Sequence, residues 1–236
     1  MNKTKLFNEI FKVKSFVTFA PRIVPVGLVP VKLDFRKLMS HPAVFRILLE
    51  ALKEEAEKIN FDLIAAGEIS GIPWGAGLAL VMNKPFIYVH KTKTSGINLV
   101  EGDYKKGQKV ILIDDMIAYG EKKQAFAENL KDSGLNVSDI MVILAHTDRK
   151  FAREERWLKK EGINLHYLFT WKELAEEQMK RKIIPKEIYP YYLNFMEHPE
   201  QWSDNDKKKW QEYCRVLKNK LNVSIPEEWE EMLKMK

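Results

Sequence analysis

Two adjacent carboxylates, Asp114 and Asp115, directly follow the apolar run Val110-Ile111-Leu112-Ile113. This run is rich in β-branched residues and favours a buried strand, and a turn with Gly120 separates the acids from a helix-forming segment that begins at Glu121. Open α/β sheets bind ligands beyond the carboxyl ends of their strands, where hydroxyl groups, water or a cation could satisfy both acids. The alternative is a solvated Asp-Asp turn that caps the next helix, and this stretch alone favours neither.

The elements around these acids alternate between strand and helix. The hydrophobic pattern predicts strands at 62–66, 86–89, 110–113, 140–145 and 165–169, and helices at 42–59, 73–82, 121–131 and 151–160. This order predicts an α/β fold with a doubly wound parallel sheet. Strand-like segments at 11–19 and 24–35 predict a small N-terminal β-rich hood, and the chain beyond residue 172 has an amphipathic helical pattern. We therefore expect a main domain at 1–180, with its hood at 1–40, and a C-terminal helical extension at 181–236.

Residues 91–107 interrupt this alternation. The stretch is polar, contains glycine and is long for a connection in a compact domain. Loops of this kind are often lids or binding loops. Because this one directly precedes the strand that carries the acids, we expect a lid.

Composition narrows the class of protein. The chain of 236 residues is 45% hydrophobic, which is enough for a substantial core. No apolar run approaches the roughly 18 residues that span a bilayer, and the charged N-terminus lacks the apolar core of a signal peptide. The lone Cys214 excludes an internal disulfide and a cysteine-based zinc site. We expect a soluble cytoplasmic protein with no membrane association.

The net charge of +6 lies at the N-terminus. Residues 1–40 hold eight Lys and Arg against two acids, and the remaining bases and acids cancel. Such a local excess favours a confined anionic ligand, such as a substrate that carries phosphate. It does not favour nucleic acid, for which a basic helix face or interleaved aromatic residues would be typical.

Several segments together resemble those of the type I phosphoribosyltransferases, and within them the orotate phosphoribosyltransferases. They include the Gly-Ile-Pro that ends at Pro73, the Lys-Pro that begins at Lys84 and the Asp114-Asp115 pair. The matching segments, in order, are 11–15, 33–40, 67–73, 84–93, 100–102, 114–115, 148–149 and 162–166. The resemblance covers roughly residues 7 to 178 and is specific only as a set.

The resemblance implies transfer of ribose 5-phosphate from phosphoribosyl pyrophosphate (PRPP) to orotate, with Mg²⁺ bound through PRPP and water. It implies catalytic roles for Lys93, Asp114 and Asp115. It places PRPP against Ser70, Gly71, His90, Lys91, Lys93, Asp114, Asp115, Ala118, Tyr119, Gly120, Glu121 and Lys122. Lys14 and Arg149 would bind the base. It also implies a homodimer, because the lid of the family reaches the partner subunit.

The chain departs from the family pattern at the loop that holds the 5′-phosphate. The usual hydroxyl residues are replaced by Ala118, Glu121 and Lys122, which leaves backbone amides and Lys122 or Lys123 to compensate. His90 stands where arginine is usual, and Glu68 and Ser70 are also atypical. Three interpretations follow: a divergent orotate phosphoribosyltransferase, which we favour; a catalytically impaired relative with a nucleotide-sensing or regulatory role; or a phosphoribosyltransferase for another base.

Overall fold

The computed structural model describes most of the chain. The described residues are 2–24, 27–92, 96, 98–117, 121–146, 153–198, 202 and 207–221. They fall into two compact units. The sheet unit comprises Met1–Lys12 and Phe35–Thr170, and the hood unit comprises Val13–Asp34 and Trp171–Lys236.

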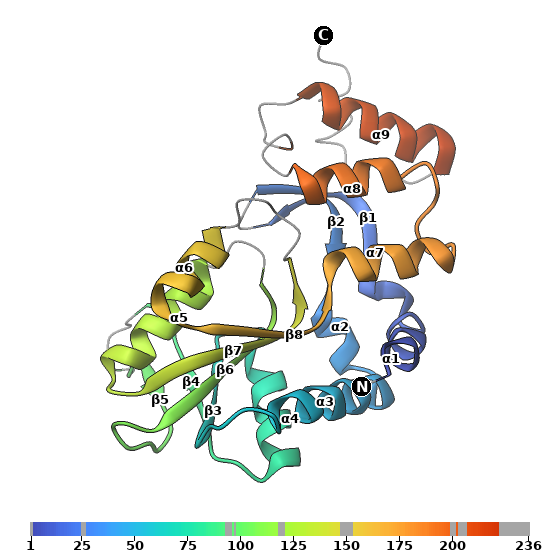
Figure 1. Ribbon diagram of the computed structural model, residues 1–236. Helices are drawn as coiled ribbons and strands as arrows, with labels where there is room; N and C mark the ends of the chain where they lie inside the picture. The colour runs from blue at the N-terminus through green and yellow to red at the C-terminus, as the bar shows by residue number, and fades with distance from the viewer. Residues whose placement is uncertain are drawn as a thin grey trace. The chain divides into compact units, whose positions relative to one another are not determined.

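The sheet unit is built around a six-stranded, mostly parallel sheet with the order β5-β4-β3-β6-β7-β8 (Figure 1). The strands are β3 (Leu63–Gly67), β4 (Phe86–Val89), β5 (Val100–Glu101), β6 (Lys109–Ile117), β7 (Asn136–Ala145) and β8 (Asn164–Thr170). The short edge strand β5 is antiparallel to β4, and the other pairs are parallel. From β3 the chain moves first outward to β4 and then back across to β6. The direction of strand addition therefore reverses between β3 and β6, which is where such sheets bind ligands.

Helices cover both faces of this sheet, which confirms the predicted doubly wound architecture (Figure 1). Helices α3 (Pro42–Ala56) and α4 (Ile72–Met82) pack on one face, with α1 (Lys3–Ile10) and α2 (Phe35–Met39) against α3. Helices α5 (Glu121–Asp132) and α6 (Arg153–Glu161) pack on the other. Because both faces are covered, β3 is buried along its whole length and β7 along most of it.

The hood unit combines a β-hairpin with the C-terminal helices. A 3₁₀ turn, η1 (Lys14–Phe16), leads into the antiparallel strands β1 (Val17–Val24) and β2 (Gly27–Leu33). The helices are α7 (Trp171–Lys180), α8 (Tyr189–Glu197) and α9 (Lys207–Leu221). Helix α8 packs on β2 and α9 on β1. Trp202, Trp210 and Tyr213 form an aromatic cluster in which each pair of rings meets at a steep angle.

The structure corrects some of the predicted boundaries. The segment expected as a strand at 11–19 is strand only from Val17. Residues 11–12 form a turn after α1, and residues 14–16 form η1. Strand β6 does not end at Ile113 but continues through both acids to Ile117. The extension has a physical cause: the longer β7 lies alongside, so that Asp114 is paired with Val142 in the ladder.

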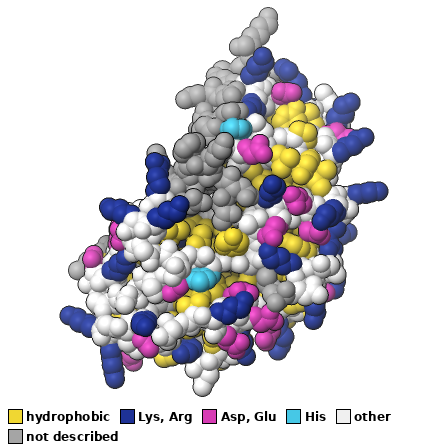
Figure 2. Space-filling view, viewed as in Figure 1, with side chains coloured by type: hydrophobic (Ala, Val, Ile, Leu, Met, Phe, Trp, Pro, Cys, Tyr) yellow, Lys and Arg dark blue, Asp and Glu magenta, His cyan; other side chains and the backbone are white. Residues whose placement is uncertain are grey.

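Charged side chains are mixed on the surface. Figure 2 shows Lys and Arg spread over the visible face among Asp and Glu, with hydrophobic side chains between them. In the described part of the chain, no helix combines the length and apolar character needed to cross a membrane.

Candidate active site

The acid pair lies at the carboxyl end of β6, beside the point where the strand order reverses. Asp114 is only 3% exposed, and Asp115 is half-buried. Asp114 Oδ1 accepts hydrogen bonds from the Asp115 N–H at 2.8 Å and from Ser70 Oγ at 3.3 Å. Asp115 Oδ1 accepts one from the Met116 N–H at 2.8 Å. The solvated-turn alternative therefore fails for Asp114, because its carboxylate is buried and bonded across the sheet.

A lysine from the next helix completes the environment of Asp114. The Lys123 ammonium group lies 2.6 Å from Asp114 Oδ2, and both side chains are largely buried. Lys123 is in the first turn of α5, on the helix face that carries the buried residues Phe126, Ala127 and Leu130. From the sequence, Lys123 is expected only as a possible compensating charge. Its helical spacing with those apolar residues is the signal that could have placed it inside.

The surroundings of Asp115 disfavour its charged form. Burial raises the pKa of Asp115 to about 7, and the negative charge of Asp114 adds to the rise, whereas Lys123 opposes it. Near neutral pH, Asp115 is therefore poised between its neutral and ionised forms. A bound hydroxyl or cation would favour the ionised form.

The loop between β3 and α4 lies against the end of β6. A Cβ atom on Gly71 would come within 2.8 Å of the Ile113 carbonyl oxygen and 3.1 Å of Asp114 Oδ1. Only glycine fits so close an approach of backbone to backbone. The preceding Ser70 uses this proximity to donate its hydroxyl to Asp114. The predicted contact residues Ser70 and Gly71 are thus brought to the acid pair.

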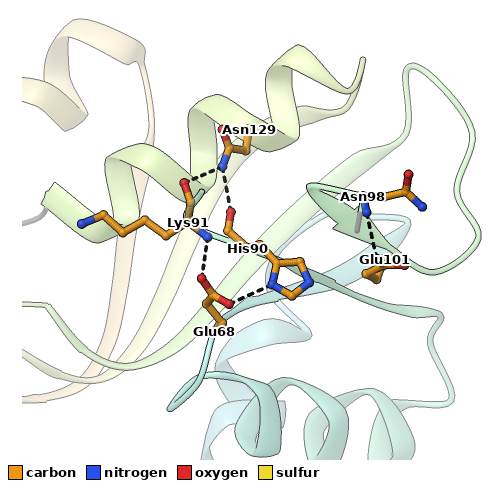
Figure 3. Close-up of polar contacts among 6 residues, drawn as sticks. All are labelled: Glu68, His90, Lys91, Asn98, Glu101 and Asn129. Atoms are coloured by element: carbon orange, nitrogen blue, oxygen red, sulfur yellow. Dashed lines mark hydrogen bonds and ion pairs between the residues drawn. The ribbon is translucent and has the colours of Figure 1, made fainter. Parts of the chain in front are cut away.

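Glu68, in the same loop, binds the start of the segment predicted to be a lid (Figure 3). Its carboxylate lies 2.8 Å from His90 Nδ1 and accepts the Lys91 N–H at 2.9 Å. The side-chain amide of Asn129, from α5, donates to the carbonyl oxygens of His90 and Lys91 at 2.7 and 3.2 Å. The backbone at residues 90–91 is therefore held from both sides, and we call these four residues the lid clamp.

Glu68 is ionised within the lid clamp. The Lys91 N–H and then His90 hold the pKa of Glu68 below its usual range. Two departures from the family pattern, Glu68 and His90, thus bind each other. Sequence reasoning noted each departure separately and missed Asn129. Their positions at the ends of the neighbouring strands β3 and β4 are the signal that could have paired the first two.

The other predicted site residues differ in what the structure says of them. Lys14 lies in η1 of the hood unit and is exposed, and Lys122 is exposed in the first turn of α5. The backbone of Glu121 begins α5, but its side chain is not described. The predicted residues outside the described part of the chain are Lys93, Ala118, Tyr119, Gly120 and Arg149.

Solved structures share this architecture. UMP synthase from Leishmania donovani superposes with a TM-score of 0.73 at 25% identity, covering 83% of this chain and 42% of that one. Orotate phosphoribosyltransferase from Aeropyrum pernix gives a TM-score of 0.63 at 25% identity, covering 74% of this chain and 99% of that one. The fold, with an acid pair at its reversal point, is that of the type I phosphoribosyltransferases.

Sequence comparison narrows the class. The orotate phosphoribosyltransferase of Dinoroseobacter shibae is 32% identical over 196 residues, which cover 80% of this chain and 85% of that relative. No family model matches the chain. The chain belongs to the orotate phosphoribosyltransferase family, as the motifs indicated.

Proposed function

We propose that this chain transfers ribose 5-phosphate from PRPP to orotate, giving orotidine 5′-phosphate and pyrophosphate. The observation that carries the proposal is the acid pair at the reversal point of the sheet, with Asp114 bonded to Ser70 from the loop after β3. Family membership supplies the substrates, and the retained acid pair supports an active enzyme rather than a remnant of one.

The chemistry sets what the residues must do. Positive charge develops on the ribose as negative charge leaves with pyrophosphate, so catalysis is a matter of positioning and electrostatics. The carboxylates of Asp114 and Asp115 accept hydrogen bonds from the ribose hydroxyl groups and stabilise the positive charge that develops on the ribose. We assign Lys91 and Lys93 to the pyrophosphate, and Lys14 and Arg149 to the base, whose carboxylate suits a cationic donor.

The remaining PRPP contacts follow the same assignment. Ser70, Gly71 and His90 would lie around the pyrophosphate, and the 5′-phosphate would bind at the start of α5. The residues of that second group are Ala118, Tyr119, Gly120, Glu121 and Lys122. We extend the proposal to a homodimer, as the family resemblance implies, and to a location in the cytoplasm, as the composition indicated.

The residues present fit a magnesium ion held mainly by the substrate. Carboxylate oxygens are ligands that Mg²⁺ accepts, and it commonly keeps several waters. The described residues contain no cluster of three or more metal-binding side chains. PRPP oxygens and water would supply the ligands, with Asp114 and Asp115 beside the ion but not bound to it. When bound, the ion would offset the charge of the pyrophosphate.

The test is a turnover assay with orotate, PRPP and Mg²⁺, in which the fall in orotate absorbance and the release of pyrophosphate are measured. Asp114→Asn and Asp115→Asn should each lower kcat/KM by at least about a hundredfold, because each weakens an interaction that strengthens in the transition state. Circular dichroism should show an intact fold.

Other outcomes separate the alternatives. Release of pyrophosphate only with another base would identify a different phosphoribosyltransferase. PRPP binding by calorimetry without turnover on any base would indicate the regulatory relative. Unchanged activity in both variants would remove the acid pair from the site.

A further inference from the structure

Lys123 is a charged residue on the inward face of a helix. It is only 8% exposed, and it shares the helical stripe of Phe126, Ala127 and Leu130, which are each at most 1% exposed. Burial of an ammonium group is costly unless a partner of opposite charge compensates. Packing in the hydrophobic core therefore does not explain why a lysine stands at position 123.

The partner is the Asp114 carboxylate. Lys123 Nζ lies 2.6 Å from Oδ2, while Oδ1 accepts the Asp115 N–H and the Ser70 hydroxyl. Donors from β6, from the loop after β3 and from α5 thus converge on one carboxylate. Its orientation is fixed before any substrate binds, and such preorganisation favours electrostatic catalysis.

We propose that Lys123 is a positioning residue of the transfer reaction, which holds Asp114 oriented and offsets its charge so that Asp115 can also ionise and accept ribose hydroxyl groups. The proposal rests on the proposed function. It gives this chain an internal cation bonded to the acid pair, from a helix whose first residues, with the loop before them, lack the family's hydroxyl residues.

The electrostatics of Asp115 support this role. The charged groups that face Asp115 in the described part of the chain are Asp114 beside it on β6 and Lys123 from α5. Asp114 raises the pKa of Asp115 and Lys123 lowers it. Without Lys123, Asp115 would keep its proton to higher pH. Its protonated oxygen would then donate a hydrogen bond and could not accept one from a ribose hydroxyl group.

The decisive experiment compares pH profiles of kcat/KM for the wild type, Lys123→Met, Lys123→Gln and Lys123→Arg. We expect Lys123→Met to lose about tenfold or more at pH 7, with the acidic limb moved to higher pH and a smaller loss at pH 9. Lys123→Gln keeps a hydrogen-bond donor but removes the charge, and it should show the same shift of the acidic limb. It replaces Lys123→Met in the comparison where the methionine variant does not fold. Lys123→Arg should retain most activity.

The control is Lys131→Met on the same helix, where an exposed ion pair with Glu161 is lost. It should leave the profile unchanged. A loss in the Lys123 variants that is independent of pH, or equally large in Lys123→Arg, would overturn the proposal. If the wild type has no turnover, the proposed function fails. Carbon-13 NMR titration of the Asp115 carboxyl still tests Lys123, and an unshifted titration in Lys123→Gln would refute its role.

Discussion

Asp114 and Asp115 are neighbours in sequence, but they are held in different ways. The charges of Asp114 and Lys123 both act on the Asp115 carboxylate, so the two acids share one environment. Asp114 receives an ion pair and two hydrogen bonds, whereas desolvation dominates at Asp115. Asp114 is therefore the more firmly bonded of the two, and Asp115 is the acid whose charge its surroundings disfavour.

The raised pKa of Asp115 predicts a cost in stability. Between about pH 4, where an unfolded Asp titrates, and about pH 7, the folded protein holds a proton that the unfolded chain has lost. The stability of the free protein should therefore fall as pH rises through this range. Asp115→Asn removes this dependence and should be more stable than the wild type at pH 8, although we expect it to lose most of its activity.

Thermal unfolding of both proteins at pH 4 and pH 8 measures this effect. The difference in Tm should be small at pH 4 and should favour Asp115→Asn at pH 8. Equal differences at the two pH values would show that the environment of Asp115 does not disfavour its charge. PRPP and Mg²⁺ must be absent, because a ligand that binds the ionised form would stabilise the wild type.

At the scale of elements, the lid clamp joins three segments that are far apart in sequence. Glu68 follows β3, His90 and Lys91 follow β4, and Asn129 lies within α5. Both polar groups of the peptide between residues 90 and 91 are bonded, since Glu68 accepts its N–H and Asn129 donates to its carbonyl. The backbone at the start of the predicted lid is therefore held in place, and with it the backbone of Lys91.

Asn129→Ala should loosen this fixed point. Two hydrogen bonds to backbone carbonyls are lost, which should cost about 1–2 kcal/mol of stability. If Lys91 binds the pyrophosphate, KM for PRPP should rise more than kcat falls. Steady-state kinetics and denaturant unfolding measure both effects.

The matched control is Gln124→Ala, which removes an amide of the same helix that binds Glu128 on the surface. It should change neither KM nor stability appreciably. A similar rise in KM for both variants would mean that the clamp has no particular role in positioning the lid.

The sequence predicted the elements better than their contacts. The β-branched run at 110–113 predicted β6, and alternating elements predicted the sheet with helices on both faces. Helix α1 was missed because it is short, although Leu6, Phe7 and Ile10 carry helical spacing and Asn2 caps its first turn. The pairs Lys123–Asp114 and Glu68–His90 were missed, because each joins side chains from different elements. The apolar stripe of Lys123 on α5 and the strand-end positions of Glu68 and His90 are the only local signals that point to them.

At the scale of the molecule, each compact unit combines segments that are far apart in the sequence, which local sequence patterns do not reveal. In the sequence, all six strands of the sheet lie between the hairpin at 17–33 and helices α7, α8 and α9. The hairpin and these helices nevertheless form one compact unit. A long-range hydrogen bond marks this association: the Tyr213 hydroxyl, buried in α9, donates to the Pro30 carbonyl oxygen at 2.6 Å. Within the hood unit, the C-terminal helices therefore support the hairpin of β1 and β2, which follows Lys14 in the chain.

Tyr213→Phe tests this support with the loss of one oxygen atom. The Pro30 carbonyl would be left buried without its partner, which should destabilise the hood by about 1–3 kcal/mol. Amide hydrogen exchange should therefore accelerate at 27–33 and remain unchanged in β3, β6 and β7, because local unfolding of one compact unit need not open the other. Tyr167→Phe, at a partly exposed position in β8, is the control. If exchange at 27–33 responded equally to both variants, α9 would not be what holds the hairpin, and the extension would need another role.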